Sequence, residues 1–446
     1  MIVVGELVFA GLILFFLLFS FYNIREKENR AFRRSFSFLI FLILLYLFSL
    51  HTASNLKTYL FGSVFVLTMI GLFWVFLSLA PRRETLIVGK QHKIDERDVI
   101  FSRADYIEGT KIFDEYYKKR SVYKKKDDQI RRLPDILTHF HIKKDPVPFS
   151  LAKAEFDFLE HQLHLVNGKE NSKKHRLSAY ENTKMIKSVI RYLGAENCGI
   201  CSLNQAYIYS HVGRGPEVYG QSIKNPHRFA IIFAVEMDYE MISAAPKAPV
   251  IVETGKRYVE AARISIISAD LIRRLGYSAR AHIAGSNYQA MLPPIAWEAG
   301  LGEIGRLGIL ITGKYGPCAR LGLVTTELNL IPDKAKNLGI QDFCRKCHKC
   351  ADNCPAKAIP YGDKKEENGV QKWVLNREKC YKYWRKVGTD CALCILACPF
   401  SKPDNFFHNL FRSVTAKSSA MQSLSIWGDQ FFYGRPHQSR KQTFFH

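Results

Sequence analysis

The sequence predicts an α+β protein with three membrane-spanning helices at its N-terminus and a cysteine-rich segment near its C-terminus. Three observations support this prediction. The first 80 residues contain three apolar runs, the middle of the chain mixes helical and strand-like patterns, and eight cysteines lie between Cys344 and Cys398. A chain of 446 residues has room for about two to four domains, so these segments can fold as separate parts.

The apolar runs cover residues 2–22, 36–50 and 59–80. A helix needs about 20 apolar residues to cross the bilayer core, and the first and third runs meet that length. The second run is short, so it either gains length from its flanks or forms a hairpin that dips into the membrane. No basic region precedes the first run and further spans follow it, which argues against a cleavable signal peptide.

Basic residues flank the apolar runs unevenly. The loop after the first run and the segment after the third carry Arg25, Lys27, Arg30, Arg33, Arg34, Arg82, Arg83, Lys90 and Lys93, and the opposite side carries only Lys57. Because positive charge stays in the cytoplasm, we expect a multi-pass protein of the cell inner membrane whose large remainder is cytoplasmic. Arg33-Arg34 also resembles a twin-arginine export signal. That signal would stand second in a row of spans, so we favour the juxtamembrane interpretation.

The chain is strongly basic, with 64 Lys and Arg against 41 Asp and Glu and a net charge of +23. Such a balance favours an anionic partner surface, either phospholipid or nucleic acid. Tyr116, Tyr117 and Tyr123 alternate with the basic runs 118–120 and 124–126. Lipid head groups attract such clusters, and a single-stranded nucleic acid could stack on the rings. With membrane helices next to this region, we expect membrane lipid or a solvated surface, and no nucleic acid.

The residue pattern of 184–324 is typical of a mixed α and β domain. We expect helices over residues 185–193 and 254–275 and a buried strand over 229–235, with short apolar runs at 308–311 and 321–324. Arg273, Arg274 and Gly276 form the stop signal of the long helix.

Gly300, Gly302 and Gly305 match the dinucleotide fingerprint GxGxxG. The context does not fit, because the preceding residues look helical and no acidic residue follows at the required distance. We expect these glycines to bring bare backbone close to some other ligand.

The first four cysteines of the cysteine-rich segment, Cys344, Cys347, Cys350 and Cys354, have the spacing of a bacterial ferredoxin. In that pattern three thiolates hold one cubane and the fourth binds the partner cluster. Two [4Fe-4S] clusters follow, one held by Cys344, Cys347, Cys350 and Cys398 and the other by Cys354, Cys380, Cys391 and Cys394. Ten residues rather than two separate Cys380 from Cys391, so that ligand comes from a longer loop.

Other uses of these cysteines fit less well. Zinc sites also use CxxC pairs, but eight cysteines in two halves, each closed by Cys-Pro, favour clusters. A disulfide framework belongs to short secreted chains. The three remaining cysteines, Cys198, Cys201 and Cys318, are expected to be reduced thiols, and Cys198 and Cys201 to be buried or incidental rather than a redox pair.

Several motifs in the second half of the chain resemble those of a known family. They are Arg273-Arg-Leu-Gly276-Tyr277, Ala299-Gly-Leu-Gly-Glu303-Ile-Gly-Arg306, Tyr315-Gly-Pro317, Arg320, Thr325-Thr-Glu-Leu328, Asp342-Phe-Cys344, Gly388-Thr-Asp-Cys391 and Tyr433-Gly434. In order and spacing they resemble the reductive dehalogenases, corrinoid and iron–sulfur enzymes that remove halide from organic molecules. The resemblance runs from about residue 188 to about residue 434. It implies a nitroreductase-like cobalamin-binding core fused to a ferredoxin-like domain with two clusters.

The resemblance also implies roles for single residues. Tyr258 matches the family's catalytic tyrosine, Arg320 its basic partner and Asn287 its substrate-facing asparagine. Gly300, Gly302, Gly305 and Tyr315 are the expected cofactor contacts. A phenol is a suitable acid for a carbanion-like carbon, and a guanidinium beside it favours the phenolate. From its residues alone, Tyr258 would pass as a core aromatic on an amphipathic helix.

Five parts are predicted. They are a membrane anchor (1–83), a basic juxtamembrane region (84–168), a cobalamin- and substrate-binding domain (169–340), a ferredoxin-like domain (341–402) and a C-terminal segment that packs on the core (403–446). The expected partners are an organohalide, membrane lipid and an electron donor, which is a quinol, a membrane oxidoreductase or a ferredoxin. Family members usually have an export leader and a separate anchor, so this chain departs from them at its N-terminus.

Two other functions remain open from the sequence. An epoxyqueuosine reductase-like enzyme acting on tRNA would explain the basic charge, but no acidic proton donor matches that family here. A membrane-bound iron–sulfur electron-transfer module would use the clusters without dehalogenation. Cobalamin content, halide release and tRNA binding separate these possibilities.

Overall fold

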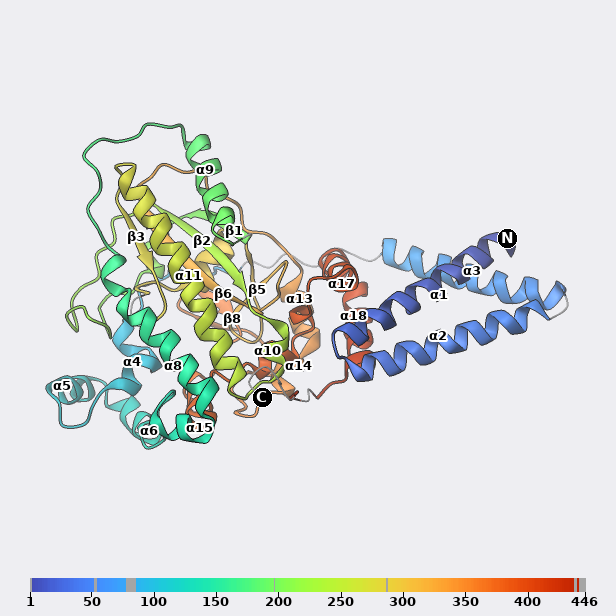
Figure 1. The fold of residues 1–446 in the computed structure, drawn as a ribbon, viewed down its shortest axis with the longest axis horizontal. Coiled ribbons are helices and arrows are strands. Elements are labelled where there is room, and N and C mark those ends of the chain that lie inside the picture. The colour runs from blue at the N-terminus through green and yellow to red at the C-terminus, as the bar shows by residue number, and fades with distance from the viewer. Residues whose placement is uncertain are drawn as a thin grey trace. The chain divides into compact units, whose positions relative to one another are not determined.

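The computed structural model describes residues 2–51, 54–77, 86–195, 197–285, 288–436 and 439–440. The chain divides into two compact units. The first consists of Met1–Arg83 with Asn405–Pro436, and the second of Glu84–Asp404 with His437–His446. Each unit is held together by contacts within itself (Figure 1).

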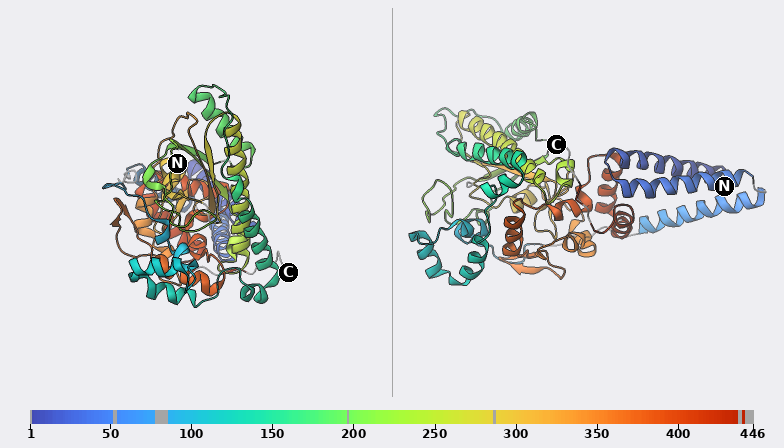
Figure 2. Two further views of the ribbon diagram at one scale, coloured as in Figure 1. Left: turned by 90° about the vertical axis from the view of Figure 1, so that its left-hand side faces the viewer. Right: turned by 60° about the horizontal axis from the view of Figure 1, so that its bottom comes forward.

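Three helices form the N-terminal part of the first unit: α1 (Ile2–Arg25), α2 (Asn29–Leu50) and α3 (Ser54–Leu77). α1 packs against both others, and Figures 1 and 2 show the three side by side. Within the described residues, Val3–Arg25 and Asn29–Ser49 are long and apolar enough to cross a membrane, whereas α3 contributes only the shorter apolar stretch Phe61–Ile70. The expected three spans are therefore corrected to two.

The second apolar run forms one continuous helix and not a hairpin. α2 begins at Asn29, ahead of the apolar residues 36–50, and its first turns carry Arg30, Arg33 and Arg34. The helix thus reaches spanning length by including an arginine-rich first part. Of the two alternatives for this short run, extension from its flanks or a hairpin, the structure has the extension.

The C-terminal helices α17 (Phe406–Lys417) and α18 (Ser419–Tyr433) belong to the first unit, so the expectation that residues 403–446 pack on the core is wrong for Asn405–Pro436. Aromatic contacts give the reason. The Phe407 ring lies 5.1 Å from the Phe15 ring, and the Phe432 ring lies 5.2 Å from the Phe19 ring, centroid to centroid. α18 also packs against α2.

A four-stranded antiparallel sheet forms the centre of the second unit. Its order is β1-β2-β6-β3, with β1 at Asn197–Ser202, β2 at Phe229–Glu236, β6 at Ala319–Thr326 and β3 at Ala279–His282. β2 is buried over all but its last residue, as its unbroken apolar sequence predicts. In the register, Ile231 pairs with Ile200 on one side and with Val324 on the other.

Helices cover both faces of this sheet and confirm a mixed α and β fold. The long helix α11 (Pro249–Arg274) packs on β6 and β3 (Figure 1), and it is flanked by α8 (Pro146–His161), which packs on α11, and α9 (Ala179–Tyr192), which contacts α11 and β1. On the opposite face, α12 (Leu292–Glu298) contacts β2 and β6. α11 begins five residues before the predicted helix because Pro249 suits a first turn.

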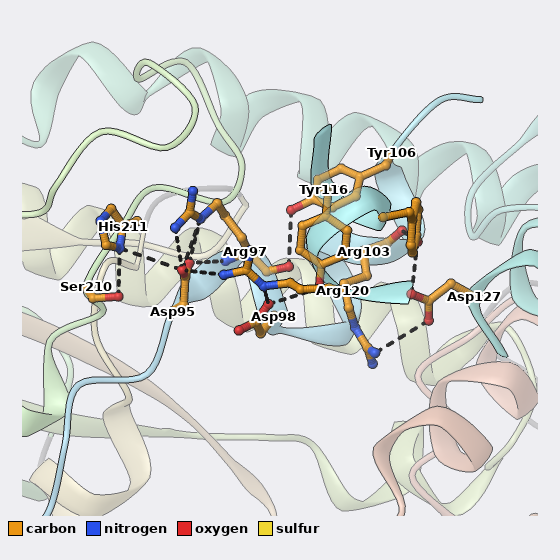
Figure 3. A network of polar contacts seen from close by, with 11 residues as sticks. Asp95, Arg97, Asp98, Arg103, Tyr106, Tyr116, Arg120, Asp127, Ser210 and His211 are labelled. Carbon is orange, nitrogen blue, oxygen red and sulfur yellow. Dashed lines mark hydrogen bonds and ion pairs between the residues drawn. The ribbon is translucent and has the colours of Figure 1, made fainter. Parts of the chain in front are cut away.

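The region before α8 is helical, not merely charged and patchy. It contains η1 (Glu96–Asp98), α4 (Ile100–Asp105), α5 (Lys111–Lys119), α6 (Ser121–Arg131) and α7 (His139–Lys144). Figure 3 shows the polar network that involves η1, α4, α5 and α6. Arg120 pairs with Asp95 at 3.0 Å, and the Tyr116 hydroxyl donates to Asp98 at 3.0 Å.

This network changes the interpretation of the basic and aromatic cluster. Tyr116 and Tyr117 are buried, and the Tyr117 hydroxyl donates to Asp127 at 2.9 Å. Arg103, itself buried, pairs with Glu378 at 2.6 Å and so links α4 to the cysteine-rich segment. Buried rings cannot stack on bases, so this pattern serves folding.

The cysteine-rich segment consists of short helices around a small hairpin. The helices are α13 (Ile340–Cys347), α14 (Lys349–Asp352), α15 (Arg377–Val387), α16 (Leu393–Ala397) and η4 (Pro399–Ser401), and the hairpin is β7 (Lys365–Glu367) with β8 (Val370–Lys372). A second two-stranded sheet joins β4 (Gly302–Ile304) to β5 (Leu310–Thr312). The remaining short elements are η2 (Leu163–Leu165), η3 (Gln205–Tyr207) and α10 (Tyr239–Ser243).

Candidate functional site

Four cysteines from two distant parts of the chain line one small cavity. Cys344, Cys347 and Cys350 come from α13 and α14, and Cys398 comes from the end of α16. Arg306 and Phe343 complete much of the wall. Four thiols around one space are the donor set that an iron–sulfur cluster requires. We call this group the first cysteine set.

The other four cysteines also lie near one another, and we call them the second cysteine set: Cys354, Cys380, Cys391 and Cys394. Burial and the neighbouring thiols Cys380 and Cys391 raise the pKa of Cys394 well above its usual value. Burial and the nearby Cys354 raise the pKa of Cys380 to about 12. Such thiols are neutral by themselves, and iron binding would supply the thiolate form.

The two sets share a backbone feature. His348 follows Cys347 with a φ of 55°, and Ala392 follows Cys391 with a φ of 54°. Both residues have backbone angles in the left-handed region, which residues other than glycine seldom adopt. In each half of the segment, a residue with left-handed backbone thus follows the first cysteine of a CxxC pair.

A larger cavity of about 470 Å³ lies on the α12 side of the central sheet. Its walls are mainly apolar and aromatic. The aromatic side chains in its lining are Tyr207, Tyr209, Tyr258, Tyr288, Trp297 and Trp373. A volume of this size and a mostly apolar lining with few polar groups are typical of small-molecule sites.

Tyr258 and Arg320 meet in this cavity, although one lies on α11 and the other on β6. The guanidinium carbon of Arg320 lies 5.2 Å from the centre of the Tyr258 ring. Burial alone would lower the pKa of Arg320, but the neighbouring Tyr258 and Asp390 outweigh it and raise that pKa. The cavity therefore holds a permanent cation beside a phenol.

Asp390 and Thr254 hold Arg320 in place. The Arg320 guanidinium forms an ion pair with Asp390 and donates to Thr254 Oγ1 at 2.6 Å. The Thr254 hydroxyl in turn donates to Asp390 Oδ2 at 2.8 Å. Arg320 Nε and Asp390 Oδ1 are buried without a hydrogen-bond partner among the described residues, which leaves polar capacity for a bound molecule.

Asp390 directly precedes Cys391, so the ion pair connects the cavity to the second cysteine set. Sequence reasoning missed this role, because the motif Gly388-Thr-Asp-Cys391 gives no sign of a partner seventy positions earlier. It also missed Tyr288, which lines the cavity beside Tyr258. Burial raises the pKa of Tyr288 well above its usual value, and the nearby Tyr258 phenol adds to this effect.

Asn287, the expected substrate contact, lies outside the described residues. The expected cofactor contacts Gly300, Gly302 and Gly305 are not among the residues that line the larger cavity. A Cβ atom on Gly300 would stand 2.5 Å from the Lys334 carbonyl oxygen, and one on Gly302 would stand 2.2 Å from that of Ile311. Gly300 and Gly302 thus bring backbone close to other backbone, and a role of these glycines in cofactor binding stays a prediction.

Tyr315 is likewise absent from the cavity lining. It is buried in a tight turn after β5, where its backbone N–H donates to Thr312 Oγ1 at 2.9 Å. The next residue, Gly316, faces the Phe400 carbonyl so closely that a Cβ atom would stand 2.1 Å from it. This turn fits the central domain against the cysteine-rich segment.

Cys198 and Cys201 lie on β1, and the three-residue spacing directs them to opposite faces of the sheet. Cys201 belongs to the core on the α12 side, and Cys198 packs against the core on the α11 side. Burial raises the pKa of each thiol to about 12. This placement does not suit a redox pair, and neither thiol is activated.

Comparison with known protein families gives one match, to a 4Fe-4S dicluster domain over residues 343–402. Among curated proteins, the chain is 32% identical over 306 residues to the tetrachloroethene reductive dehalogenase of Dehalobacter restrictus, covering 58% of this chain and 55% of that protein. It is 31% identical over 150 residues to the epoxyqueuosine reductase of Lactococcus garvieae, covering 28% of this chain and 39% of that protein. The chain spans about half the length of the tetrachloroethene reductive dehalogenases that it matches.

Among solved structures, the fold is similar to that of the catabolic reductive dehalogenase NpRdhA in complex with 3-bromo-4-hydroxybenzoic acid. The TM-score is 0.65 at 24% sequence identity, covering 81% of this chain and 50% of that one. This likeness establishes the fold, in which a mixed α and β domain carries a cysteine-rich domain.

Proposed function

We propose, on the premise that this chain is a relative of the reductive dehalogenases, that it removes halide from an organohalide by corrinoid chemistry. One observation carries the proposal. The fold brings Tyr258 and Arg320 together in an apolar cavity and joins that cavity to the cysteine-rich segment through Asp390.

The corrinoid would occupy a nitroreductase-like domain formed by residues 169–340, next to the larger cavity. The apolar walls, including Leu310, Trp297 and Trp373, suit the flat faces of a macrocycle, and the unpaired Nε of Arg320 suits a polar group. When bound, the reduced corrinoid supplies the electrons that break the carbon–halogen bond.

Tyr258 would act as the proton donor. Loss of halide with two electrons leaves a carbanion-like carbon, and the Tyr258 hydroxyl gives that carbon its proton. Arg320 then stabilises the phenolate, because a cation held close to an anion in an apolar site interacts strongly with it. Asp390 and Thr254 fix the guanidinium so that this interaction needs no rearrangement.

Electrons would arrive through two [4Fe-4S] clusters held by the first and second cysteine sets. The dicluster match over residues 343–402 supports this ligand assignment. A quinol, a membrane oxidoreductase and a soluble ferredoxin all remain candidates for the donor.

We propose that residues 341–402 form the ferredoxin-like domain. Residues 84–168 would then be a helical support for it, since Arg103 pairs with Glu378.

The decisive experiment is anaerobic reconstitution with cobalamin, iron and sulfide, followed by turnover of chlorinated, brominated and iodinated aromatics with a reduced viologen. We expect free halide from the wild type and at least a ~100-fold loss in Tyr258→Phe, in line with the usual contribution of a proton donor. Tyr180→Phe is the matched control, because Tyr180 is exposed on α9, outside the lining of the cavity. Near-normal turnover by Tyr258→Phe would remove this residue from the mechanism.

A second candidate function is electron transfer without dehalogenation, favoured by the dicluster match alone. Protein that binds iron and sulfide but no corrinoid would establish it. The epoxyqueuosine reductase alternative requires binding to tRNA, which a filter assay measures. The burial of Tyr116 and Tyr117 removes two aromatic rings that such binding could have used.

We also propose that α1 and α2 anchor the protein in the cell inner membrane, with lipid as the partner. Only 22% and 17% of their apolar windows are buried, so these helices face outward rather than into a core. α17 and α18 pack near the loop between them, where His408 Nε2 lies 3.0 Å from Glu26 and the Arg34 guanidinium lies 4.6 Å from the Phe431 ring centre. Leu424 and Trp427 on α18 are exposed and suit the interfacial layer.

The loop end of α1 and α2 carries Arg25, Lys27, Arg30, Arg33 and Arg34, so we place this loop in the cytoplasm. An impermeant maleimide should label Lys27→Cys only from the cytoplasmic face. It should label the control Lys57→Cys only from outside. Labelling of both variants from one side would contradict the orientation.

A further inference from the structure

The surroundings of the two cysteine sets carry an inference about electron flow. Arg306 follows β4 and is only 2% exposed. It lines the cavity of the first cysteine set, and its Nε donates to the Cys344 carbonyl at 3.0 Å. A guanidinium stays protonated in proteins. A full positive charge therefore lies against the first set.

Arg306 is fixed in this place. Its Nη1 donates to three successive carbonyl oxygens, those of Pro360 at 2.8 Å, Tyr361 at 2.9 Å and Gly362 at 3.0 Å. Its guanidinium carbon also lies 4.7 Å from the centre of the Trp373 ring. These hydrogen-bond and ring partners are neutral, so they fix the guanidinium without neutralising it. Burial lowers the pKa of Arg306, and the Asp363 carboxylate opposes this less than the thiols of the first set do.

A second cation stands on the same ring. Lys364 Nζ lies 4.7 Å from the centre of Trp373. Trp373 itself lines the larger cavity, and the residues after Arg306, Gly308 and Ile309, line it as well. The wall between the first cysteine set and the larger cavity is thus cationic.

The second cysteine set has different surroundings. Asp390 precedes Cys391, and its carboxylate is paired with Arg320. The ion pair beside Cys391 therefore contains both signs, so its net charge is close to zero. The two sets are matched in their ligands and differ in the charge beside them.

We propose that Arg306 raises the reduction potential of the cluster bound by Cys344, Cys347, Cys350 and Cys398 above that of its partner. An electron added to a cluster increases its negative charge, and a fixed cation in a buried site stabilises that state. Electrons that enter the domain then rest on the first cluster, beside the wall of the larger cavity. The proposal rests on the proposed cluster ligation and does not depend on dehalogenation.

The test is a redox titration of the full-length, anaerobically reconstituted protein, followed by electron paramagnetic resonance without any organohalide. In Arg306→Gln we expect one potential to become more negative by at least a tenfold change in the reduction equilibrium, which is about 59 mV for one electron. The other potential should stay unchanged. A Cys380→Ala variant, which lacks a ligand of the second cluster, identifies the signal of the first.

Arg345→Gln is the matched control. Arg345 also lies between two cysteines of the first set, Cys344 and Cys347 on α13, but its side chain is 46% exposed and pairs with Asp342 at 3.6 Å. Water and the carboxylate screen its charge, so its loss should shift the potential much less than the loss of Arg306. Equal shifts in the two variants, equal shifts of both clusters, or no shift in Arg306→Gln would each overturn the proposal.

Lys364→Gln covers the case in which Arg306→Gln loses iron. Lys364 is only half-buried, so its replacement disturbs packing less. The same cluster should shift in the same direction by a smaller amount. An unchanged potential in this variant would count against the cationic wall. Because the titration uses no substrate, failure of dehalogenation leaves its outcome readable.

Discussion

Two arginines stand between the cysteine sets and the larger cavity, and they differ in what holds them. Arg306 donates to backbone carbonyls beside the first set, whereas Arg320 pairs with Asp390 beside the second. The carbonyls leave the charge of Arg306 available to the iron. Asp390 offsets the charge of Arg320 and fixes its direction toward Tyr258. Arginine therefore sets a reduction potential at the first cysteine set, and at the second set it presents an oriented guanidinium to Tyr258.

The comparison of the two arginines fails if the cysteines are assigned to the wrong clusters. Cys398 stands in the second run of the sequence but lines the cavity of the first set. We expect Cys398→Ser to lose the cluster whose potential responds to Arg306, and Cys354→Ser to lose the other. Iron content should fall by about half in both variants. Loss of the same cluster in both, seen by electron paramagnetic resonance, would refute the crossed ligation.

Asp390→Asn should leave Arg320, like Arg306, without a carboxylate partner among the described residues. Arg320 would then be a buried charge that has lost its ion pair. Breaking a buried ion pair costs about 3–5 kcal/mol, so we expect a clear drop in unfolding free energy. We also expect at least about tenfold slower halide release and a more positive potential of the second cluster. Denaturant unfolding, halide release and redox titration measure these effects.

Asp404→Asn is the control for this prediction. Asp404 pairs with Lys314 at 3.7 Å on a partly exposed surface, where an ion pair contributes about 0–1 kcal/mol. We expect stability, halide release and both potentials to stay near the wild type. If Asp390→Asn behaves like this control, Asp390 does not position Arg320.

Replacement of each arginine by lysine sharpens the comparison. Lysine keeps the charge but lacks the planar fork. Arg306→Lys should keep the potential of the first cluster close to the wild type, because charge alone matters there. Arg320→Lys should slow halide release by about tenfold, since one ammonium cannot hold the same geometry against Asp390, Thr254 and Tyr258. If Arg306→Lys shifted the potential and Arg320→Lys left halide release unchanged, the roles assigned to the two arginines would be wrong.

The smallest effect concerns a buried histidine pair behind Tyr288. His282 Nδ1 contacts the Tyr288 carbonyl, and both His282 and His227 bond to Thr325 Oγ1, at 2.9 and 2.8 Å. Burial lowers the pKa of His227 to about 4 and that of His282 to about 3. Both are therefore neutral in the folded state, and unfolding below pH 6.5 takes up protons.

Stability should accordingly fall as pH drops from about 6.5 to about 4, whereas above 6.5 this contribution is complete. His227→Gln should reduce the slope of unfolding free energy against pH in that interval. Denaturant unfolding at pH 7 and pH 5 measures it. An unchanged slope would show that His227 is not neutral when folded.

Local patterns in the sequence predicted local structure well. The apolar run at β2, the helix α11 with its stop at Arg274, and the grouping of cysteines all follow from residue type and spacing. The dicluster match and the reductive dehalogenase relatives confirm the family resemblance. These features depend on periodicity or on motifs within a few residues.

The failures involve partners that are distant in the sequence. Nothing near Arg320 indicates Asp390, and nothing near Arg306 indicates the carbonyls of residues 360–362. The space beside the glycines at 300, 302 and 305 is taken by Lys334 and Ile311, which their ligand-binding pattern does not indicate. Tyr116 and Tyr117 look like surface aromatics until Asp98 and Asp127 are brought beside them.

The first unit joins Met1–Arg83 to the distant segment Asn405–Pro436, because α17 and α18 pack on α1 and α2. A ribosome makes α1 and α2 first, and more than 300 residues follow before Phe407 and Phe432 exist to cover Phe15 and Phe19. The first unit is therefore completed only after nearly all of the second unit has been synthesised. A chain that stops before α17 leaves Phe15 and Phe19 without these aromatic partners.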